Sequence, residues 1–416
     1  MLNKDGQREL AYIVKIDAIE PIVGSDNCEA AVVGGWKVMV RKQTFQPGDL
    51  AIYFEIDSHI DTNKPEFAFL EKKHGNIKTQ KYTFGGKNPG FYSQGLLMTA
   101  NDFGWELTDS GQFTGDTPII KKPDGKYFVE GDFLTQELGV TYADPDDNKR
   151  KAKVNPDAQI NNALARHPKI AKKYGKLIKK NKFFRWLFIA LYGKKKVSSW
   201  PVGVPKTDEE RIENRPWTLE AHDVKWIATE KIDGTSTTFY LKRGKGLNKP
   251  VYLVCSRNVV FDTPDKKNYY SDSIGNVYLE MSEKYHMREV LEKLLEQRPS
   301  AEWVAVQAET FGAGVQKRDY GMKDHEIRAF NLRYSDCGRV GTLQMRDELE
   351  PLGVPVVPIL SEGMCLPSTI DNLREFVHAT PSKIDGGMRE GIVFRTLDGA
   401  DSFKCVDPEF LLRYHQ

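Results

Sequence analysis

The sequence of 416 residues lacks any uninterrupted apolar run near the length of a bilayer span, which argues against a transmembrane helix. Its first twenty residues place charged side chains among the apolar ones, unlike a signal peptide. The sequence therefore predicts neither a transmembrane helix nor a signal peptide. We expect a cytoplasmic protein without a membrane partner.

Cysteine is scarce and scattered. The five cysteines form no CxxC pair, are odd in number, and have no nearby histidine at zinc-finger spacing. This pattern excludes a disulfide framework and a zinc finger, and it predicts buried, reduced thiols. The residues concerned are Cys28, Cys255, Cys337, Cys365 and Cys405.

The chain as a whole also lacks an excess of charge of one sign, because 60 Lys and Arg face 58 Asp and Glu and the net charge is only +2. The distribution along the chain is uneven. Residues 149–196 hold sixteen Lys or Arg and a single acid, Asp157, so this segment carries +15 and the remainder carries −13. A local basic surface is therefore predicted in an otherwise acidic protein.

The first third of the chain alternates apolar and polar residues in short runs, such as CEAAVVGGWKVMVRK and GDLAIYFEID, separated by turn-forming clusters such as FQPGD. Several short strands at this spacing predict a small β-barrel or sandwich. We favour an OB-type barrel over residues 1–140, because such barrels bind oligonucleotides; a generic β-domain fits the pattern nearly as well.

Residues 141–199 differ in character and predict a basic helical linker or insert, with two helical pieces broken around Pro168 and Gly175. The aromatic residues of this segment have two compatible interpretations. They dock on a neighbouring domain, or they stack on nucleic acid while the lysines contact phosphates. These aromatics are Phe183, Phe184, Trp186 and Phe188.

From residue 200 to 416 strand-like and helix-like patterns alternate, and Tyr285 to Pro299 reads as an amphipathic helix, so we predict an α+β domain. This domain contains the tetrapeptide KIDG twice, at Lys231 and at Lys383. Lys231 stands between two strand-like runs, in a tight connection. Lys383 stands in a turn with glycines after it and is interpreted as an ordinary loop lysine.

Candidates for further chemistry follow Lys231 in or beside strand-like runs. A lysine must lose its proton to attack a phosphorus atom, and attack on a nucleoside triphosphate also needs a divalent metal, carboxylates and cations. The candidates are Arg257 in VCSRN, Glu309 in VQAETFGAGVQ, Phe330 in IRAFNLR, Glu390 in REGIVFR and Lys404 in SFKCVDPEFLL. Singly, each has an ordinary structural explanation, and their joint order is the informative signal.

This order resembles the covalent nucleotidyltransferase superfamily of polynucleotide ligases and RNA capping enzymes. The phrases GWKVMVRKQTFQPGDLAIYFEIDS, YSQGLLM, PKTDEERIEN, TEKIDGTS and SFKCVDPEFLL are most similar to ATP-dependent, nick-sealing RNA ligases with an N-terminal OB domain. The resemblance implies an α+β protein with an OB-like barrel, a basic helical linker and a C-terminal nucleotidyltransferase (adenylyltransferase) domain built on antiparallel sheets. It also implies ATP and Mg²⁺ or Mn²⁺ as cofactors.

Roles are implied for individual residues. Lys231 would form lysyl-AMP, with Asp233, Glu390 and Lys404 as the other catalytic residues. Nucleotide contacts are implied for Glu230, Ile232, Arg257, Glu309, Phe330, Lys404 and Arg211, and metal contacts for Asp233, Glu309 and Glu390.

The sequence departs from this family at one position, because a second lysine often follows two residues after the first in the last motif, and Val406 stands there. Lys404 would then act alone on the α-phosphate, or Arg211 or Lys206 would share the task. Only 12 residues follow Lys404, too few for a barrel, which favours an RNA ligase over a DNA ligase or capping guanylyltransferase with a C-terminal OB domain.

We therefore expect an RNA ligase that joins 3′-OH and 5′-phosphate ends, acts as a monomer and takes RNA in a nicked duplex, in RNA repair or nick sealing. The alternative from another class is a non-catalytic RNA-binding protein with a degenerate enzyme domain. Retention of Lys231, Glu309, Glu390 and Lys404 together argues against that alternative.

Overall fold

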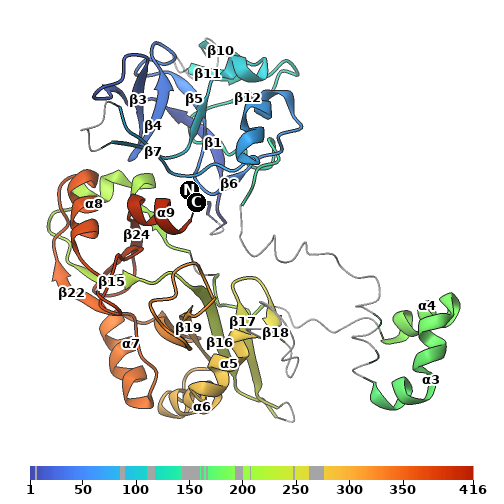
Figure 1. Cartoon of the computed structure of the whole chain (residues 1–416). Coiled ribbons are helices and arrows are strands. Elements are labelled where there is room, and N and C mark those ends of the chain that lie inside the picture. The colour runs from blue at the N-terminus through green and yellow to red at the C-terminus, as the bar shows by residue number, and fades with distance from the viewer. Residues whose placement is uncertain are drawn as a thin grey trace.

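The computed structural model describes most of the chain in two β-rich domains and a separate helical pair (Figure 1). The described residues are 1–4, 7–84, 90–109, 118–142, 160, 164, 167–192, 200–206, 208–246, 249–261 and 276–415. Parts of the predicted basic segment, residues 149–159, 161–163, 165–166 and 193–196, lie outside these ranges. No helix in the described ranges is long and apolar enough to cross a membrane.

The N-terminal domain is built from short antiparallel strands, as the alternating pattern predicted. In β4 the residues Trp36, Val38 and Val40 are buried while their neighbours are more exposed, which is the period of two expected for a half-buried strand. The strands are β1 (Ala11–Lys15), β2 (Ala18–Pro21), β3 (Cys28–Val33), β4 (Trp36–Arg41), β5 (Leu50–Phe54), β6 (Ser58–His59), β7 (Gln80–Tyr82), β8 (Phe91–Ser93), β9 (Leu96–Met98), β10 (Glu106–Asp109), β11 (Pro118–Lys121), β12 (Tyr127–Phe128) and β13 (Thr141–Tyr142), with the 3₁₀-helices η1 (Pro65–Lys73) and η2 (Ala100–Phe103).

These strands pair as β1-β5-β9, β2-β3-β4, β10-β11-β12, β7-β8 and β13-β6. The last pairing joins Thr141 to His59 and Tyr142 to Ser58. The N-terminal domain thus includes Thr141 and Tyr142, just beyond the limit at residue 140 expected from the sequence.

The helical pair consists of α3 (Pro168–Lys180) and α4 (Lys182–Tyr192), which lies apart from both domains in Figure 1. Pro168 begins α3, as expected for a proline in the first turn. The predicted break at Gly175 is wrong, because α3 continues through it; one glycine costs only about 1 kcal/mol in a helix of good helix formers. The break falls at Asn181, whose side-chain oxygen accepts hydrogen bonds from the backbone N–H groups of Phe183 and Phe184.

The C-terminal domain contains two sheets and several covering helices. Its strands are β14 (Glu210–Arg211), β15 (Trp226–Lys231), β16 (Thr235–Lys242), β17 (Val251–Ser256), β18 (Val260–Phe261), β19 (Trp303–Gly312), β20 (His325–Tyr334), β21 (Gly338–Arg339), β22 (Ile359–Met364), β23 (Gly391–Thr396) and β24 (Ser402–Val406). Its helices are η3 (Ile212–Asn214), η4 (Pro216–Glu220), α5 (Val277–Lys284), α6 (Met287–Gln297), α7 (Thr342–Leu349), η5 (Glu350–Leu352), α8 (Ile370–Ala379) and α9 (Pro408–Tyr414).

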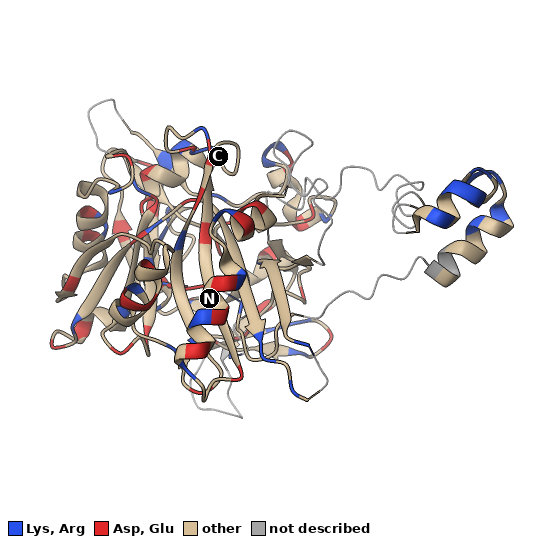
Figure 2. Ribbon diagram, turned by 90° about the horizontal axis from the view of Figure 1, so that it is seen from below, with Lys and Arg blue, Asp and Glu red and all other residues tan. Residues whose placement is uncertain are grey.

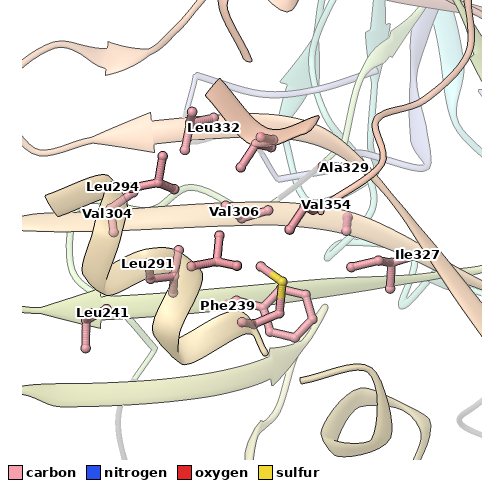
Figure 3. Close-up of a cluster of buried hydrophobic side chains, with 14 of the residues drawn as sticks. Phe239, Leu241, Leu291, Leu294, Val304, Val306, Ile327, Ala329, Leu332 and Val354 are labelled. Carbon is pink, nitrogen blue, oxygen red and sulfur yellow. The ribbon is translucent and has the colours of Figure 1, made fainter. Parts of the chain in front are cut away.

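The smaller sheet has the order β14-β24-β23-β15-β22 and the larger one β18-β17-β16-β19-β20-β21. All pairings are antiparallel except that of β14 with β24. The predicted amphipathic helix is α6, whose residues Leu291 and Leu294 pack on Val304 and Val306 of β19 within the main core (Figure 3). The α+β prediction for this half is confirmed.

All five cysteines are unpaired in the structure. The prediction that they are buried is wrong for Cys337 and Cys365, which are exposed. Cys337 lies in the turn between β20 and β21, and Cys365 directly follows β22 at the edge of its sheet. Loop positions of this kind leave a side chain in solvent whatever its intrinsic preference.

The two β-rich domains share a buried interface. Val406 and Leu411 of the C-terminal domain pack into the same apolar cluster as Trp36 and Tyr53. Asn214 Oδ1 accepts hydrogen bonds from Trp36 Nε1 at 2.6 Å and from the Tyr12 hydroxyl at 3.2 Å. The position where a second lysine was considered is therefore occupied by an apolar contact between domains.

Candidate active site

The connection between β15 and β16 places Lys231 and Asp233 where the two sheets of the C-terminal domain meet. β15 ends at Lys231 and β16 begins at Thr235, as the sequence predicted. A Cβ atom at Gly234 would lie 2.4 Å from the Thr310 carbonyl oxygen and 3.0 Å from Glu309 Cγ. Only glycine fits this close approach, which explains the last letter of the first KIDG.

Strand register in the smaller sheet brings distant residues to Lys231. Lys231 pairs with Gly391, so the preceding Glu390 lies next to the lysine, and Val393 pairs with Lys404. Arg211 of β14 in turn pairs with Lys404.

The larger sheet supplies the opposite side. Glu309 of β19 pairs with Ser236 of β16, Arg257 directly follows β17, and Phe330 lies in β20. Phe330 packs beside Ile232 and Tyr320 in a small apolar cluster.

These residues surround one cavity of about 310 Å³. Every residue to which the sequence assigned a role at the site lines it: Arg211, Glu230, Lys231, Ile232, Asp233, Arg257, Glu309, Phe330, Glu390 and Lys404. Lys206 and Lys383 are not among the lining residues. The structure thus separates the two KIDG lysines, and of the two cations considered as helpers of Lys404 only Arg211 faces the cavity.

Lys231 is held by a carboxylate. Its Nζ donates to both carboxylate oxygens of Glu390, each at 2.7 Å. Burial lowers the pKa of Lys231, but Glu390 and then Glu309 raise it by more, and the net shift is upward. The amine is therefore protonated at neutral pH and is not nucleophilic in this state.

Glu309 and Asp233 complete the acidic side of the cavity. Burial raises the pKa of Glu309 to about 8, although Lys231 opposes the shift. Asp233 Oδ1 lies 3.2 Å from His415 Nε2, and the Asp233 backbone N–H donates to the Tyr320 hydroxyl at 2.7 Å. Asp233 Oδ2 is buried and has no hydrogen-bond partner within the described part of the chain, so it can accept a ligand from the cavity.

The basic side of the cavity converges on Asp208. Lys404 Nζ donates to Asp208 Oδ1 at 2.6 Å, and Arg257 Nη2 donates to Asp208 Oδ2 at 2.9 Å. Burial would raise the pKa of Asp208, but Lys404, Arg8 and Arg257 hold it well below its usual range. Asp208 lies within PKTDEERIEN, but the sequence predicted no role for it. Nothing in a single sequence shows that this carboxylate contacts two cations distant from it in the chain.

The comparisons with known proteins agree with this geometry. Residues 10–98 match the model of an OB-fold domain, and residues 224–406, which span Lys231 to Lys404, match the model of the RNA ligase family. Residues 224–406 are therefore similar to an RNA ligase domain. A search of the curated proteins returned no match.

Solved structures similar to the whole chain are RNA ligases of Naegleria gruberi. The structure with pyrophosphate has a TM-score of 0.67 and 23% identity, and the match covers 98% of this chain and 99% of that one. A mutant with ATP and Mn has a TM-score of 0.66 and 22% identity, covering 98% of each chain, and one with AMP and Mn has 0.67 and 23%, covering 98% and 99%. These likenesses establish the fold, an N-terminal OB domain followed by the RNA ligase domain.

The OB domain also reaches the cavity of the RNA ligase domain. Arg8, Asp57, Lys78 and Tyr142 line it. Arg257 lies 5.8 Å from the centre of the Tyr142 ring, and Arg211 Nη2 lies 3.5 Å from Asp57 Oδ2. No pattern in the first third of the chain indicated these four residues, because their role depends only on how the domains pack.

The second KIDG supports the cavity around Lys231 through its backbone. Glu230, directly before Lys231, is buried, and its oxygens accept from the Ser382 hydroxyl at 2.5 Å and from the backbone N–H of Lys383 at 2.7 Å. Asp385 pairs with Arg318, whose guanidinium lies 4.3 Å from the Tyr320 ring centre. The loop of residues 382–385 therefore binds Glu230, directly before Lys231, and reaches Tyr320, which contacts the backbone of Asp233 after it.

We expect Ser382→Ala to lower the free energy of unfolding by about 1–3 kcal/mol, because a buried carboxylate oxygen of Glu230 loses its donor. Lys383→Ala is the matched control, because its side chain is exposed and its backbone N–H is kept. It should change stability by less than about 0.5 kcal/mol. Urea unfolding monitors both variants, and equal losses would contradict this role of the Ser382 hydroxyl.

The raised pKa of Glu309 predicts a pH-dependent stability of the metal-free protein. Since the folded-state pKa is about 8 and the ordinary value 4.5, the contribution of Glu309 to stability is complete below about pH 4.5 and is lost as pH rises through about 8. Glu309→Gln removes this loss, so its stability relative to wild type should improve by up to about 4 kcal/mol between pH 5 and pH 9.

Thermal or urea unfolding in EDTA across this pH range measures the effect. Glu302→Gln is the control, because Glu302 is exposed and its pKa is lowered by Lys245. A constant difference between Glu309→Gln and wild type at all pH values would refute the assignment.

Proposed function

We propose that this protein is an ATP-dependent RNA ligase that joins RNA 3′-OH and 5′-phosphate ends through lysyl-AMP on Lys231 and an RNA-adenylate. The observation that carries the proposal is the single cavity in which Lys231 meets carboxylates on one side and Lys404, Arg211 and Arg257 on the other. The Naegleria gruberi RNA ligases of the same fold, solved with ATP, AMP and Mn, support it.

In the first step Lys231 Nζ attacks the α-phosphorus of ATP. The ammonium group first loses one proton and becomes a nucleophilic amine. A P–N bond then forms, the bond from the α-phosphorus to the pyrophosphate oxygen breaks, and the nitrogen loses a second proton to solvent. The two oxygens of Glu390 already contact Nζ and are placed to take the first proton. Phe330, beside Ile232, offers an aromatic face for adenine.

The cations act on the phosphates during this step. Lys404 and Arg257 now share Asp208, so an incoming phosphate must compete with that carboxylate for them. Arg211 is buried, and its Nε and Nη1 have no partner within the described ranges, so both donors are available to an anion. Arg211 is therefore our candidate to share the work that a second lysine at position 406 would do.

The acidic residues fit a divalent cation. Within the described ranges no three His, Cys, Asp or Glu side chains are placed to hold a metal ion by themselves. Mg²⁺ usually keeps several water ligands and takes only one or two carboxylates together with substrate phosphates, and Asp233, Glu309 and Glu390 can supply these. The ion would neutralise the carboxylates that raise the pKa of Lys231, and it would stabilise charge on the phosphates.

Two further transfers complete the reaction. AMP passes from Lys231 to the RNA 5′-phosphate, which restores the amine, and the 3′-OH then attacks the activated 5′-phosphate with release of AMP. We further propose a nicked duplex as the substrate, RNA repair as the process, a monomer as the active form and the cytoplasm as the location.

The test is transfer of label from ATP. The protein is incubated with Mg²⁺ and ATP labelled at the α-phosphate, and then with RNA carrying a nick. We expect a protein label that survives alkali and neutral hydroxylamine but is released by acid, as a P–N bond is. Pyrophosphate should remove this label, and nicked RNA should discharge it with sealing. Label from GTP alone would indicate capping chemistry, and RNA binding without any label would indicate a non-catalytic protein.

A further inference from the structure

The helical pair α3–α4 carries a surface that the active site does not use. The pair has its own small core, in which Phe188 and Ile178 are buried with Ile160 and Leu164. These buried residues hold the two helices together. The remaining large apolar side chains of α4 need another explanation.

Three aromatic side chains of α4 lie in solvent. Phe183 is 62% exposed, Phe184 39% and Trp186 64%. The ring of Phe183 lies 5.7 Å from that of Phe184 and 6.2 Å from that of Trp186, so the three form one patch. Contiguous exposed aromatics mark an interaction site more often than an accident of sequence.

The helical pair that carries this patch is strongly basic. Residues 168–192 contain eight Lys or Arg and no Asp or Glu, and the ribbon of the helical pair in Figure 2 has blue segments and no red ones. The six lysines of α3 are all exposed: Lys169, Lys172, Lys173, Lys176, Lys179 and Lys180. A partner with regularly spaced negative charge would complement them.

Cations and rings interleave where the helices join. Lys179, Lys180 and Lys182 directly precede Phe183, and Arg185 separates Phe184 from Trp186. α3 does separate its lysines from an apolar face, as a membrane-bound helix would, but that apolar face packs in the core of the helical pair. Alternation of cations and rings suits a single strand of nucleic acid, whose phosphates and bases alternate in the same way.

We propose that the basic aromatic surface, defined as the exposed lysines of α3 with Phe183, Phe184 and Trp186, binds single-stranded RNA. The lysines contact phosphates, and the rings stack on bases without regard to sequence. The choice of RNA as the nucleic acid rests on the proposed ligase function. The surface would hold a single-stranded stretch of the RNA that carries the nicked duplex, at a site separate from the cavity that forms lysyl-AMP.

The test uses the full chain and two sets of substitutions. The aromatic variant carries Phe183→Ala, Phe184→Ala and Trp186→Ala, and the charge variant carries Lys172→Gln, Lys173→Gln, Lys176→Gln and Lys179→Gln. Circular dichroism checks that the helices remain. Binding of a labelled single-stranded RNA is measured against salt, and lysyl-AMP formation from ATP is measured without RNA.

We expect the aromatic variant to bind RNA at least about 10-fold more weakly. In the charge variant the slope of log affinity against log salt should fall by about 0.7 for each phosphate that the protein no longer neutralises. Lysyl-AMP formation should be unchanged in both. Unchanged RNA affinity and salt slope in both variants would overturn the proposal.

Two further outcomes separate the alternatives. If wild type binds vesicles of anionic phospholipid and the substitutions weaken only that binding, the surface is a membrane site and the proposal is wrong. If wild type forms no lysyl-AMP but the substitutions weaken RNA binding, the ligase function fails while the RNA surface stands.

Discussion

Lys231→Ala should form no detectable protein adenylate when incubated with ATP and Mg²⁺. Lys231 is the lysine at the end of β15 whose amine lies in the cavity beside Glu390. Replacement by a methyl group removes the amine beside Glu390 that would form the P–N bond, and Lys404, a second lysine in the cavity, is held instead by Asp208. Because the label is lost at the first step, sealing of nicked RNA should be lost as well.

The second KIDG provides the matched control. Lys383→Ala removes an identical side chain in an identical tetrapeptide, but that side chain is exposed and is not among the residues that line the cavity. Its label should be close to that of wild type. If Lys231→Ala still takes up label, or if Lys383→Ala loses it with the fold intact, the assignment of Lys231 as the nucleophile is wrong.

Bypassing the first step sharpens this prediction. An RNA already carrying 5′-adenylate does not need lysyl-AMP, and the cations and carboxylates of the cavity remain in Lys231→Ala. This variant should therefore still seal pre-adenylated RNA to a measurable extent, which a collapsed site would not do.

Lys404→Met should slow protein adenylation by about 10²–10³-fold, the usual loss when one preorganised charge at a transition state is removed. Lys404 is buried, lines the cavity and now contacts Asp208 at 2.6 Å. Methionine keeps most of the volume and removes the charge. Single-turnover labelling measures the rate, and thermal unfolding checks that the variant stays folded when Asp208 keeps Arg257 but loses Lys404.

Two more variants test how the cationic work is divided. Arg211→Met should also slow adenylation, because Arg211 faces the cavity with two buried donors free of partners in the described chain. Lys206→Met should have little effect, because Lys206 is exposed, contacts Asn258 Oδ1 at 2.9 Å and does not line the cavity. If Lys206→Met slows adenylation as much as Lys404→Met does, the choice of Arg211 as the residue that assists Lys404 is wrong.

The sequence predicted much of the local structure because its signals are local. Alternation with a period of two located β4, the amphipathic pattern located α6, and Pro168 marked the start of α3. β5 was also expected from an alternating run, but all five of its residues are apolar and buried. The prediction failed at Gly175, where one glycine did not outweigh the neighbouring helix formers, and the capping oxygen of Asn181 set the break instead.

The site residues, predicted from the order of the motifs, line one cavity because strand register fixes which residues are neighbours in a sheet. Once Lys231 pairs with Gly391 and Val393 with Lys404, residues far apart in the chain must become neighbours. The resemblance supplied the roles, and the strands supplied the reason that the residues can meet.

By itself the sequence determined the nucleophile candidate, the kinds of side chain around it and a strongly basic segment, because these depend on residue type and order. Only the tertiary structure decided that Asp208 joins Lys404 to Arg257, that the OB domain lines the cavity, and that the second KIDG holds Glu230. These are contacts between segments up to about 200 residues apart, made by side chains and backbone groups that look ordinary in their own neighbourhoods. Their function arises from the packing that brings them together, which one sequence does not display.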